Sequence, residues 1–382
     1  MKKLLIAAMS AAVSGKKLHS PSAFVDYPAL LKKAIDHQIH TLIFPVIQGI
    51  SGEFAPEEEL LSYWKALCFQ SGMVLVRLEV VLNKIIRAFE EEGIPVVLLK
   101  GAVLKELYPV KETRTMGDVD IIIRPEHLEQ VTERFKKEGY HKEYDSHGNV
   151  LFCRNNHITF EVFYALETVP NLWDHVIPLP EYKRVYRLSD TMSLYHLIAH
   201  LGKHLKYRGA GIRSLADIYL VMKHYRVDYD ALFVFLEEEG YTSLFSALIF
   251  ILRTELNFLG EPALGAGEEE TGRALLAYMV QYGVYGIDYG DNVFFASQRS
   301  IGREKKNRIK SFVRIFFPQA EKLGEDYAYA KKHPFLLPLA WAHRVFDKMT
   351  KEKRTITASF QEMKQADEGL EKQIALLRKL GL

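Results

Sequence analysis

The sequence predicts an α+β protein in which a small mixed β-sheet is flanked by helical regions on its N- and C-terminal sides. Apolar residues recur at three-to-four spacing up to about residue 92 and again beyond about residue 189, which is the period of amphipathic helices. Between these regions lie short runs rich in Val, Ile and aromatic residues, which are typical of strands. The 382 residues are 48% hydrophobic, enough to fill sizeable cores.

Three regions are expected along the chain. Residues 1–92 form an N-terminal helical region, residues 93–188 the α+β core, and residues 189–382 a C-terminal helical region. Fifty Lys and Arg against 48 Asp and Glu give a formal net charge of +2, which argues against a dedicated nucleic-acid binder. The only cysteines, Cys68 and Cys153, form no CxxC pair, so we expect no disulfide framework and a reducing compartment.

The first residues, "MKKLLIAAMSAAVSGKK", fit either a secretory signal peptide or the first helix of a soluble domain. We favour the helix, because Lys16 and Lys17 follow the apolar run at once. The expected location is therefore the cytoplasm. No other uncharged apolar run reaches eighteen residues, so no membrane span is expected.

The N-terminal region is predicted to contain helices over 28–47 and 56–93. Gly93 ends the second helix, since glycine accepts the left-handed dihedrals of a helix C-terminus. Residues 94–100, "IPVVLLK", have the length and composition of a strand. Residues 119–124, "VDIIIR", predict another, and Pro125 then opens a helix that Gly139 ends.

Short β-branched and aromatic pieces between 139 and 166 predict a β-meander. The turn sequences "SHGN" and "NN" separate them. From about residue 190 the pattern is helical again, with a loop-like break over 260–272. The last residues, 362–382, predict a charged amphipathic helix.

An unusual pair of acids opens the second predicted strand, in "TRTMGDVDIIIRP". Asp118 and Asp120 point to the same face, because side chains alternate along a strand, while Val119, Ile121 and Ile123 face a core. Aspartate is depleted in strands and two neighbouring carboxylates repel each other. Either the strand begins at a solvated edge and the pair is incidental, or the pair holds a cation.

A third carboxylate would complete a metal site. Paired carboxylates bind Mg²⁺, which usually also holds substrate phosphates, and three acids can form a two-metal site for phosphoryl or nucleotidyl transfer. Glu161 in "ITFEVFY" is the candidate, because it lies in the middle of a strand that can neighbour the first. The alternative is that Glu161 faces water, since Thr159 shares its face.

Basic residues lie near the same strands. In "LLKGAVLKELYP", Gly101 follows a strand and precedes a short helix, so backbone N–H groups can approach a phosphate there, and Lys100 adds a positive charge. Arg114 lies four residues before Asp118. It either clamps a triphosphate or pairs with Asp118.

Together, "LLKGAVLKELYP…R…GDVDIII" and the downstream strand acid resemble the DNA polymerase β-like nucleotidyltransferase superfamily, and most closely its uncharacterised bacterial branch. The segments "AIDHQIHTLIFPVI", "HLIAHLGKHLKYRGAGIRSLADIYLVM" and "HPFLLPLAWAHRVF" resemble helical segments of that branch, so the likeness covers most of the chain.

The resemblance implies roles for individual residues. Asp118 and Asp120 are then metal ligands, Glu161 is the third carboxylate and the base, and Gly101 is the phosphate-loop glycine. It implies Mg²⁺ or Mn²⁺ as the cofactor and a nucleoside triphosphate as substrate. The acceptor is unknown: a small molecule, a tRNA or a protein.

Three features depart from the superfamily's pattern. The turn reads Gly101-Ala102 where Gly-Ser is usual and the serine hydroxyl touches a phosphate. The turn also lies seventeen residues before Asp118, which is longer than usual, and Phe163 stands where the branch often has histidine. A catalytically inactive relative that only binds a nucleotide therefore stays open as an alternative.

A rival site is His196, His200 and His204, spaced i, i+4, i+8 on one helix face. "HLIAH" contains no Glu and no adjacent His-Asp pair follows, so neither the zinc-protease motif nor the HD-hydrolase signature is present. We expect this helix to pack on the core, with His200 or His204 near the nucleotide. A structural pair between Arg213 and Asp217 is also expected, and a metal-dependent hydrolase stays open.

A basic stretch over 299–317 interleaves cations with phenylalanines. It fits contacts to RNA phosphates, or the solvated face of an amphipathic helix, which we favour because the whole chain is nearly neutral. The stretch also leaves open a toxin–antitoxin or stress protein that modifies tRNA or a partner protein. Its cations are Arg303, Lys305, Lys306, Arg308, Lys310 and Arg314.

Overall fold

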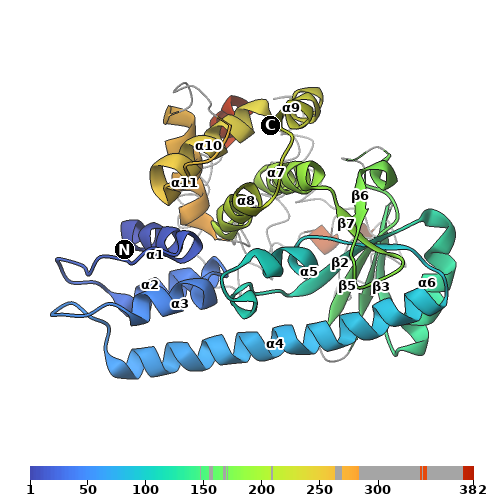
Figure 1. The fold of residues 1–382 in the computed structure, drawn as a ribbon, viewed down its shortest axis with the longest axis horizontal. Helices are drawn as coiled ribbons and strands as arrows, with labels where there is room; N and C mark the ends of the chain where they lie inside the picture. The colour runs from blue at the N-terminus through green and yellow to red at the C-terminus, as the bar shows by residue number, and fades with distance from the viewer. Residues whose placement is uncertain are drawn as a thin grey trace.

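The fold is mixed α and β, as the sequence predicts, with a seven-stranded sheet and helices on both of its faces (Figure 1). The computed structural model describes residues 1–262 apart from 147, 155–157, 167–168, 170 and 208–209, and then 269–283, 336–337, 339–341 and 373–382. The basic stretch 299–317 and most of the segment 333–346 lie outside the described residues.

Four helices precede the sheet. They are α1 (Lys2–Ser14), α2 (Tyr27–Asp36), α3 (His40–Gln48) and α4 (Glu58–Glu91). The predicted helix over 28–47 is two helices, because Gln38 takes a positive φ of 54° and breaks the run between α2 and α3. Asp26 caps α2 by accepting a 2.9 Å hydrogen bond from the Ala29 backbone N–H. After α4, Gly93 has φ 75°, as expected of a glycine that follows a helix.

Helix α4 is the longest element described, with 34 residues. It runs along one side of the molecule, from the region of α2 and α3 to the sheet (Figure 1). Its most apolar 18-residue window has a mean hydropathy of 1.4 and is 17% buried. Among the described helices, α4 alone is both long enough and apolar enough to cross a membrane. Core helices of other proteins pass the same test of length and composition.

The sheet has the strand order β3-β4-β5-β2-β1-β7-β6. Its strands are β1 (Val96–Leu98), β2 (Asp118–Ile123), β3 (His141–Ser146), β4 (Asn149–Cys153), β5 (Thr159–Phe163), β6 (Val176–Pro178) and β7 (Val185–Leu188). The antiparallel run β3-β4-β5 is the predicted meander. Strand β5 then pairs in parallel with β2, and β1 pairs antiparallel with β2 and in parallel with β7.

Short helices link these strands. They are α5 (Gly101–Leu104), η1 (Lys105–Leu107) and η2 (Lys111–Thr113) after β1, η3 (Pro125–His127) and α6 (Leu128–Lys137) after β2, and η4 (Leu172–His175) before β6. One face of the sheet packs on α4 and α6. Val119, Ile121 and Ile123 of β2 lie in this core, as their alternation with the aspartates predicts, and they contribute to the same cluster as Phe89 and Phe135.

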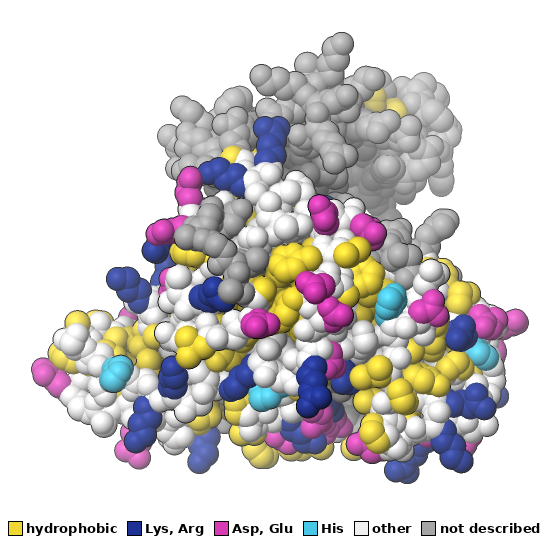
Figure 2. All heavy atoms as spheres, turned by 45° about the horizontal axis from the view of Figure 1, so that its top comes forward, with side chains coloured by type: hydrophobic (Ala, Val, Ile, Leu, Met, Phe, Trp, Pro, Cys, Tyr) yellow, Lys and Arg dark blue, Asp and Glu magenta, His cyan; other side chains and the backbone are white. Residues whose placement is uncertain are grey.

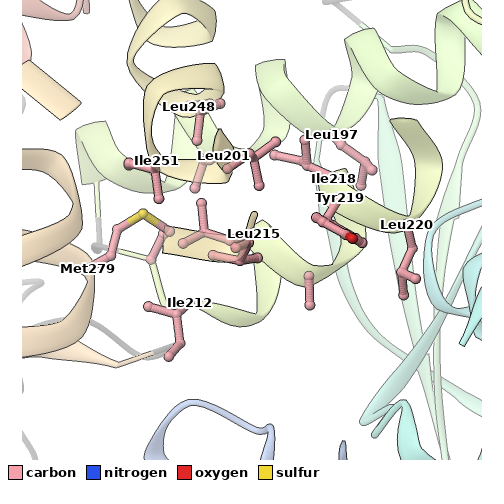
Figure 3. Close-up of a cluster of buried hydrophobic side chains, with 14 of the residues drawn as sticks. Leu197, Leu201, Ile212, Leu215, Ile218, Tyr219, Leu220, Leu248, Ile251 and Met279 are labelled. Atoms are coloured by element: carbon pink, nitrogen blue, oxygen red, sulfur yellow. The ribbon is translucent and has the colours of Figure 1, made fainter. Parts of the chain in front are cut away.

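The opposite face of the sheet meets the C-terminal helices. These are α7 (Asp190–Tyr207), α8 (Arg213–His224), α9 (Tyr229–Glu238), α10 (Thr242–Leu256) and α11 (Glu269–Tyr282), which begins inside the predicted loop 260–272. Figure 3 shows their core, in which Leu201 of α7, Leu215 of α8 and Leu248 of α10 point toward one another. Leu5 of α1 and Ile43 of α3 belong to the same cluster. Helices that precede the sheet in the chain and helices that follow it thus share one hydrophobic core.

The surface mixes charges of both signs. On the face drawn in Figure 2, Lys and Arg side chains alternate with Asp and Glu over the described residues, and they form no continuous basic stripe there. This agrees with the formal net charge of +2. The described residues of this face therefore do not form the broad basic surface that is typical of proteins that bind a nucleic-acid duplex.

Candidate active site

Three carboxylates meet on the sheet face that looks toward the C-terminal helices. The parallel register of β2 and β5 pairs Asp120 with Glu161 directly and places Asp118 beside Thr159. Each of the three acids offers an oxygen, and these oxygens all lie within 4.8 Å of one another. Within the part of the chain that the structure describes, this triad is the one group of three or more possible metal ligands so arranged.

Burial and mutual repulsion make the triad electrostatically unusual. Partial desolvation of its carboxyl and the charge of Asp120 raise the pKa of Asp118, although the residue as a whole is exposed at the start of β2. The same two causes raise the pKa of Glu161, and a 2.5 Å hydrogen bond from Asn149 Nδ2 partly offsets them. A group of acids held together in this way is stabilised by a cation.

The triad fits a hard divalent cation. All donors are carboxylate oxygens, which Mg²⁺ and Mn²⁺ prefer. Asp120 is buried, and its Oδ1 atom has no hydrogen-bond partner among the described residues. A buried carboxylate oxygen without a partner is costly, and a coordinated metal would satisfy it.

Lys100 supplies the nearest positive charge. Its Nζ lies 3.3 Å from Asp120 Oδ2 and 6.0 Å from the centre of the Phe163 ring. The backbone of Lys100 is held at φ 42° and ψ −116°, a conformation that non-glycine residues rarely adopt. Such strain is maintained where the surrounding structure fixes it, and it is common at functional sites.

Gly101 is required by close packing. A side-chain carbon added at this position would lie 2.5 Å from Arg114 Nη1 and 2.9 Å from Met116 Cγ. The space that the glycine leaves is thus filled by these two side chains. Gly101 begins α5, which is only four residues long. Its role in holding a phosphate stays a prediction.

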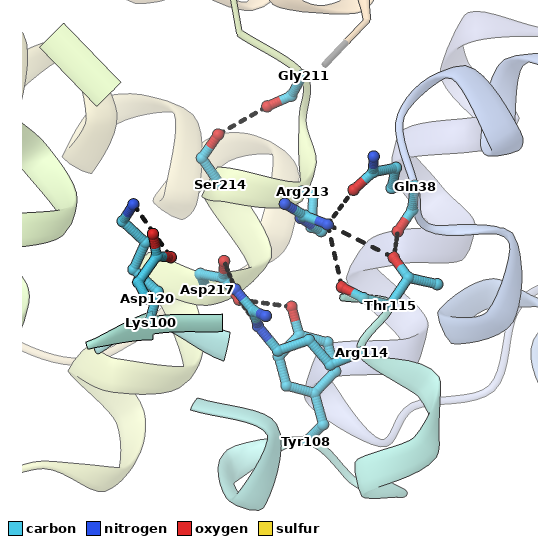
Figure 4. A network of polar contacts seen from close by, with 10 residues as sticks. All are labelled: Gln38, Lys100, Tyr108, Arg114, Thr115, Asp120, Gly211, Arg213, Ser214 and Asp217. Atoms are coloured by element: carbon cyan, nitrogen blue, oxygen red, sulfur yellow. Dashed lines mark hydrogen bonds and ion pairs between the residues drawn. The ribbon is translucent and has the colours of Figure 1, made fainter. Parts of the chain in front are cut away.

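Arg114 does not pair with Asp118. Its Nε and Nη2 atoms donate to the two carboxylate oxygens of Asp217, each at 2.9 Å, and Tyr108 Oη donates to Asp217 Oδ1 at 2.7 Å (Figure 4). Both members of the ion pair are only 5% exposed. The guanidinium holds the pKa of Asp217 below its usual value in spite of burial, which acts to raise it.

Arg213 was expected to pair with Asp217, but it makes different hydrogen bonds. Its Nη1 donates to Gln38 Oε1 and, at 3.1 Å, to the backbone carbonyl of Thr115 (Figure 4). The partner of Asp217 is instead Arg114, which the sequence spacing does not indicate. Arg213 therefore ties α8 to the α2–α3 junction and to the segment that enters β2.

The three histidines of α7 separate into two environments. Nε2 atoms of His200 and His204 lie 3.1 Å apart, close enough for a hydrogen bond between the rings. His196 is 5% exposed, and neither of its ring nitrogens has a partner among the described residues. Burial, with the positive charge of Lys100, lowers the pKa of His196 to about 3, so its ring is neutral.

His196 reaches the neighbourhood of the triad. It lines a cavity of about 20 Å³ together with Lys100, Arg187 and Ser193, large enough for one water molecule. From the sequence we expected His200 or His204 to lie near the nucleotide, whereas His196 is the histidine that lines this cavity with Lys100. Asn149 was missed as well, because only the register between β4 and β5 brings it to Glu161.

A mixed sheet that presents three carboxylates from two adjacent parallel strands, beside a lysine at the end of a third, is the arrangement of a nucleotidyltransferase. The chain belongs to the family described as uncharacterised nucleotidyltransferases, whose sequence model matches residues 24–254. This match spans every strand of the sheet and α2 to α10 nearly complete. No curated protein matches the chain.

Several solved structures are distantly similar to this chain. The antibiotic-resistance factor ANT(2'')-Ia is 13% identical, with a TM-score of 0.35, over 47% of this chain and 96% of that one. A nucleotidyltransferase-like antigen of Paracoccidioides brasiliensis is 15% identical, with a TM-score of 0.30, over 49% and 94%. A tRNA-processing enzyme is 12% identical, with a TM-score of 0.26, over 78% and 97%. The family match, and not these structures, carries the assignment.

Proposed function

We propose that this protein transfers a nucleoside monophosphate from a nucleoside triphosphate to an acceptor hydroxyl in a reaction that depends on Mg²⁺ or Mn²⁺. The observation that carries the proposal is the triad: three carboxylates converge, and the buried Oδ1 of Asp120 has no partner among the described residues. Asp118, Asp120 and Glu161 would hold the metal, which when bound neutralises phosphate charge.

The residues of the chain then have distinct tasks. Glu161 accepts the proton of the acceptor hydroxyl, a task that its raised pKa favours. The acceptor oxygen forms a bond to the α-phosphorus, the bond from that phosphorus to the bridging oxygen breaks, and pyrophosphate leaves. Lys100, whose Nζ lies 3.3 Å from Asp120 Oδ2, would bring a positive charge to the triphosphate, and backbone N–H groups at Gly101 would donate hydrogen bonds to it.

The acceptor is proposed to be a small molecule, a tRNA or a protein, and the location to be the cytoplasm.

A second candidate is an inactive relative that binds a nucleotide and acts as a regulatory or toxin–antitoxin-type interaction protein. It is motivated by Ala102, a buried residue that brings no hydroxyl to the turn where the superfamily usually has serine. In this case a nucleoside triphosphate binds without release of pyrophosphate.

The test is calorimetric titration of ATP, CTP, GTP and UTP with Mg²⁺, paired with an assay of pyrophosphate release. Asp120→Asn and Glu161→Gln should abolish turnover, because each variant lacks one of the carboxylates proposed to hold the metal. Glu53→Gln, which neutralises an exposed loop carboxylate, is the matched control and should behave as wild type. Full turnover in both site variants contradicts the proposal, and binding without turnover in wild type supports the inactive relative.

A further inference from the structure

Arg213 of α8 is held near the triad by only one of its three guanidinium nitrogens. Every hydrogen bond that it makes to a described residue comes from Nη1, which donates to Gln38 Oε1 and, at 3.1 Å, to the Thr115 carbonyl (Figure 4). The Nε and Nη2 atoms donate to none of the described residues, and the side chain is half-buried. One edge of the guanidinium is therefore anchored, and the edge formed by Nε and Nη2 is available to a ligand.

The anchor of Arg213 belongs to the fold and needs no ligand. Thr115 Oγ1 donates a 3.1 Å hydrogen bond to the Gln38 backbone carbonyl, so the two acceptors of Arg213 are also joined to each other. They come from the α2–α3 junction and from the segment that enters β2. Because a guanidinium is planar, fixing Nη1 between these groups also fixes the direction of the Nε–Nη2 edge.

The charge of Arg213 acts on the triad. Burial of its carboxyl and the charge of Asp120 raise the pKa of Asp118, and the positive charges of Lys100 and Arg213 oppose that rise. Yet no ion pair among the described residues joins Arg213 to a carboxylate of the triad. Arg213 is thus within electrostatic reach of the acids without being neutralised by them. An anion that binds a metal on the triad would be attracted to Arg213 as well.

Arg114 shows what such an edge binds. It was the arginine that the sequence indicated for a triphosphate, but its Nε and Nη2 atoms donate to the two carboxylate oxygens of Asp217, each at 2.9 Å. Arg213 presents the same edge without an internal carboxylate. Phosphates bind a guanidinium in this two-donor geometry as carboxylates do. Burial and the charge of Arg114 lower the pKa of Arg213, so an anion beside Arg213 would offset an unfavourable environment.

We propose that Arg213 binds the β- and γ-phosphates of the nucleoside triphosphate through its Nε and Nη2 atoms. The inference rests on the proposed function, in which a metal on the triad acts at the α-phosphate, where the new bond forms. Lys100 contacts Asp120 directly and lies with the reacting phosphate, whereas Arg213 contacts no acid of the triad. Arg213 is therefore the described cation left for the outer phosphates, and Gln38 and Thr115 are its positioning residues.

The experiment measures how strongly the protein prefers a triphosphate to the matching monophosphate. Calorimetry with Mg²⁺ gives the Kd of ATP, CTP, GTP and UTP, and competition against the tightest of them gives the Kd of its monophosphate. In Arg213→Gln the preference for the triphosphate should fall about 10- to 100-fold, because hydrogen bonds between charged groups are lost. Arg213→Lys keeps the charge but not the two-donor edge, so its preference should fall by a smaller factor. Arg226→Gln, at an exposed position between α8 and α9, is the matched control and should equal wild type.

The outcomes separate this inference from the proposed function. If wild type binds none of the four triphosphates, both are overturned. If wild type binds one of them and Arg213→Gln binds it equally well, the inference alone is overturned. An equal loss of triphosphate and monophosphate also overturns it, since a distorted site gives that result. Circular dichroism shows whether Arg213→Gln is folded, and Arg213→Lys decides the question if it is not: an unchanged preference in that variant contradicts a role for the two-donor edge.

Discussion

Asp118 illustrates how a charge that we propose to bind metal destabilises the metal-free structure that carries it. Its raised pKa means that the folded state prefers the protonated carboxyl, so the residue's contribution to stability is present at acidic pH and is lost as the pH rises through the folded pKa. At neutral pH, without a divalent cation, the ionised group is a liability. The proposed metal-binding role of this residue is thus opposed to the stability of the metal-free protein.

Asp118→Asn should therefore stabilise the metal-free protein at pH 7. The expected gain in the free energy of unfolding is at most about 1 kcal/mol, because the position is exposed and water screens its charge. Urea unfolding at pH 7 and pH 4 measures it, and the gain should shrink at pH 4. A variant that is less stable than wild type at pH 7, while Glu53→Gln is unchanged, contradicts this account.

His196 has the opposite pH behaviour. Its pKa is lowered to about 3 in the folded state, whereas an unfolded chain binds this proton near pH 6.5. The unfolded state thus holds more protons between these values, so stability falls as the pH is lowered through this range.

Urea unfolding at pH 7 and pH 5 tests this expectation. Wild type should lose about 2 kcal/mol more than His196→Gln between the two pH values. His19→Gln, at an exposed position, should show the wild-type pH dependence. Equal losses in wild type and His196→Gln would mean that the ring is accessible to protons in the folded state.

The sequence predicted which acids lie together better than it predicted which acid pairs with which basic residue. Asp118, Asp120 and Glu161 could be proposed as a group, because strand alternation fixes which side chains share a face. The partner of Arg114 could not, since Asp217 comes from α8, about a hundred residues later, and no local spacing encodes that contact. The proximity of Lys100 to Asp120 likewise depends on the pairing of β1 with β2.

At the scale of the elements, the buried ion pair between Arg114 and Asp217 links the segment between β1 and β2 to α8. Tyr108 and Arg114 both lie between β1 and β2, and both contact Asp217. Removing one partner of a buried pair leaves an uncompensated charge, which costs far more than an exposed pair contributes.

Asp217→Asn should lower the free energy of unfolding by about 3–5 kcal/mol, because Arg114 remains buried and charged. Chemical denaturation measures the loss. Glu269→Gln breaks the exposed i, i+4 pair with Arg273 and serves as the control, with a change near the error of the measurement. A loss in Asp217→Asn as small as in the control would show that water reaches Arg114.

Elements with clear periodicity or turn residues were predicted, and strands β6 and β7 were missed. The helices of the N-terminal region, β1, β2 and the meander all have clear periodicity or turn residues. Strands β6 and β7 are three and four residues long, and nothing in their composition separates them from loop. Their position in the sheet comes from tertiary pairing with β1, which sequence propensity does not report.

At the scale of the whole molecule, helices that precede the sheet in the chain pack together with helices that follow it. Residues of α1 and α3 share a hydrophobic core with α7, α8 and α10. The predicted regions 1–92 and 189–382 are separate in sequence, and periodicity could indicate their helices but not their contact. The carboxylate triad lies between this helical layer and the sheet, and α4 joins the two.

The parallel pairing of β1 with β7 has a consequence for the state of the sheet during synthesis of the chain. Until Val185–Leu188 have left the ribosome, β1 has β2 on one side and an open edge on the other. An open edge of apolar residues such as Val96 and Leu98 invites pairing with other chains. Lys100 directly follows this strand, so the segment that places its amine beside Asp120 borders an open sheet edge until β7 has formed.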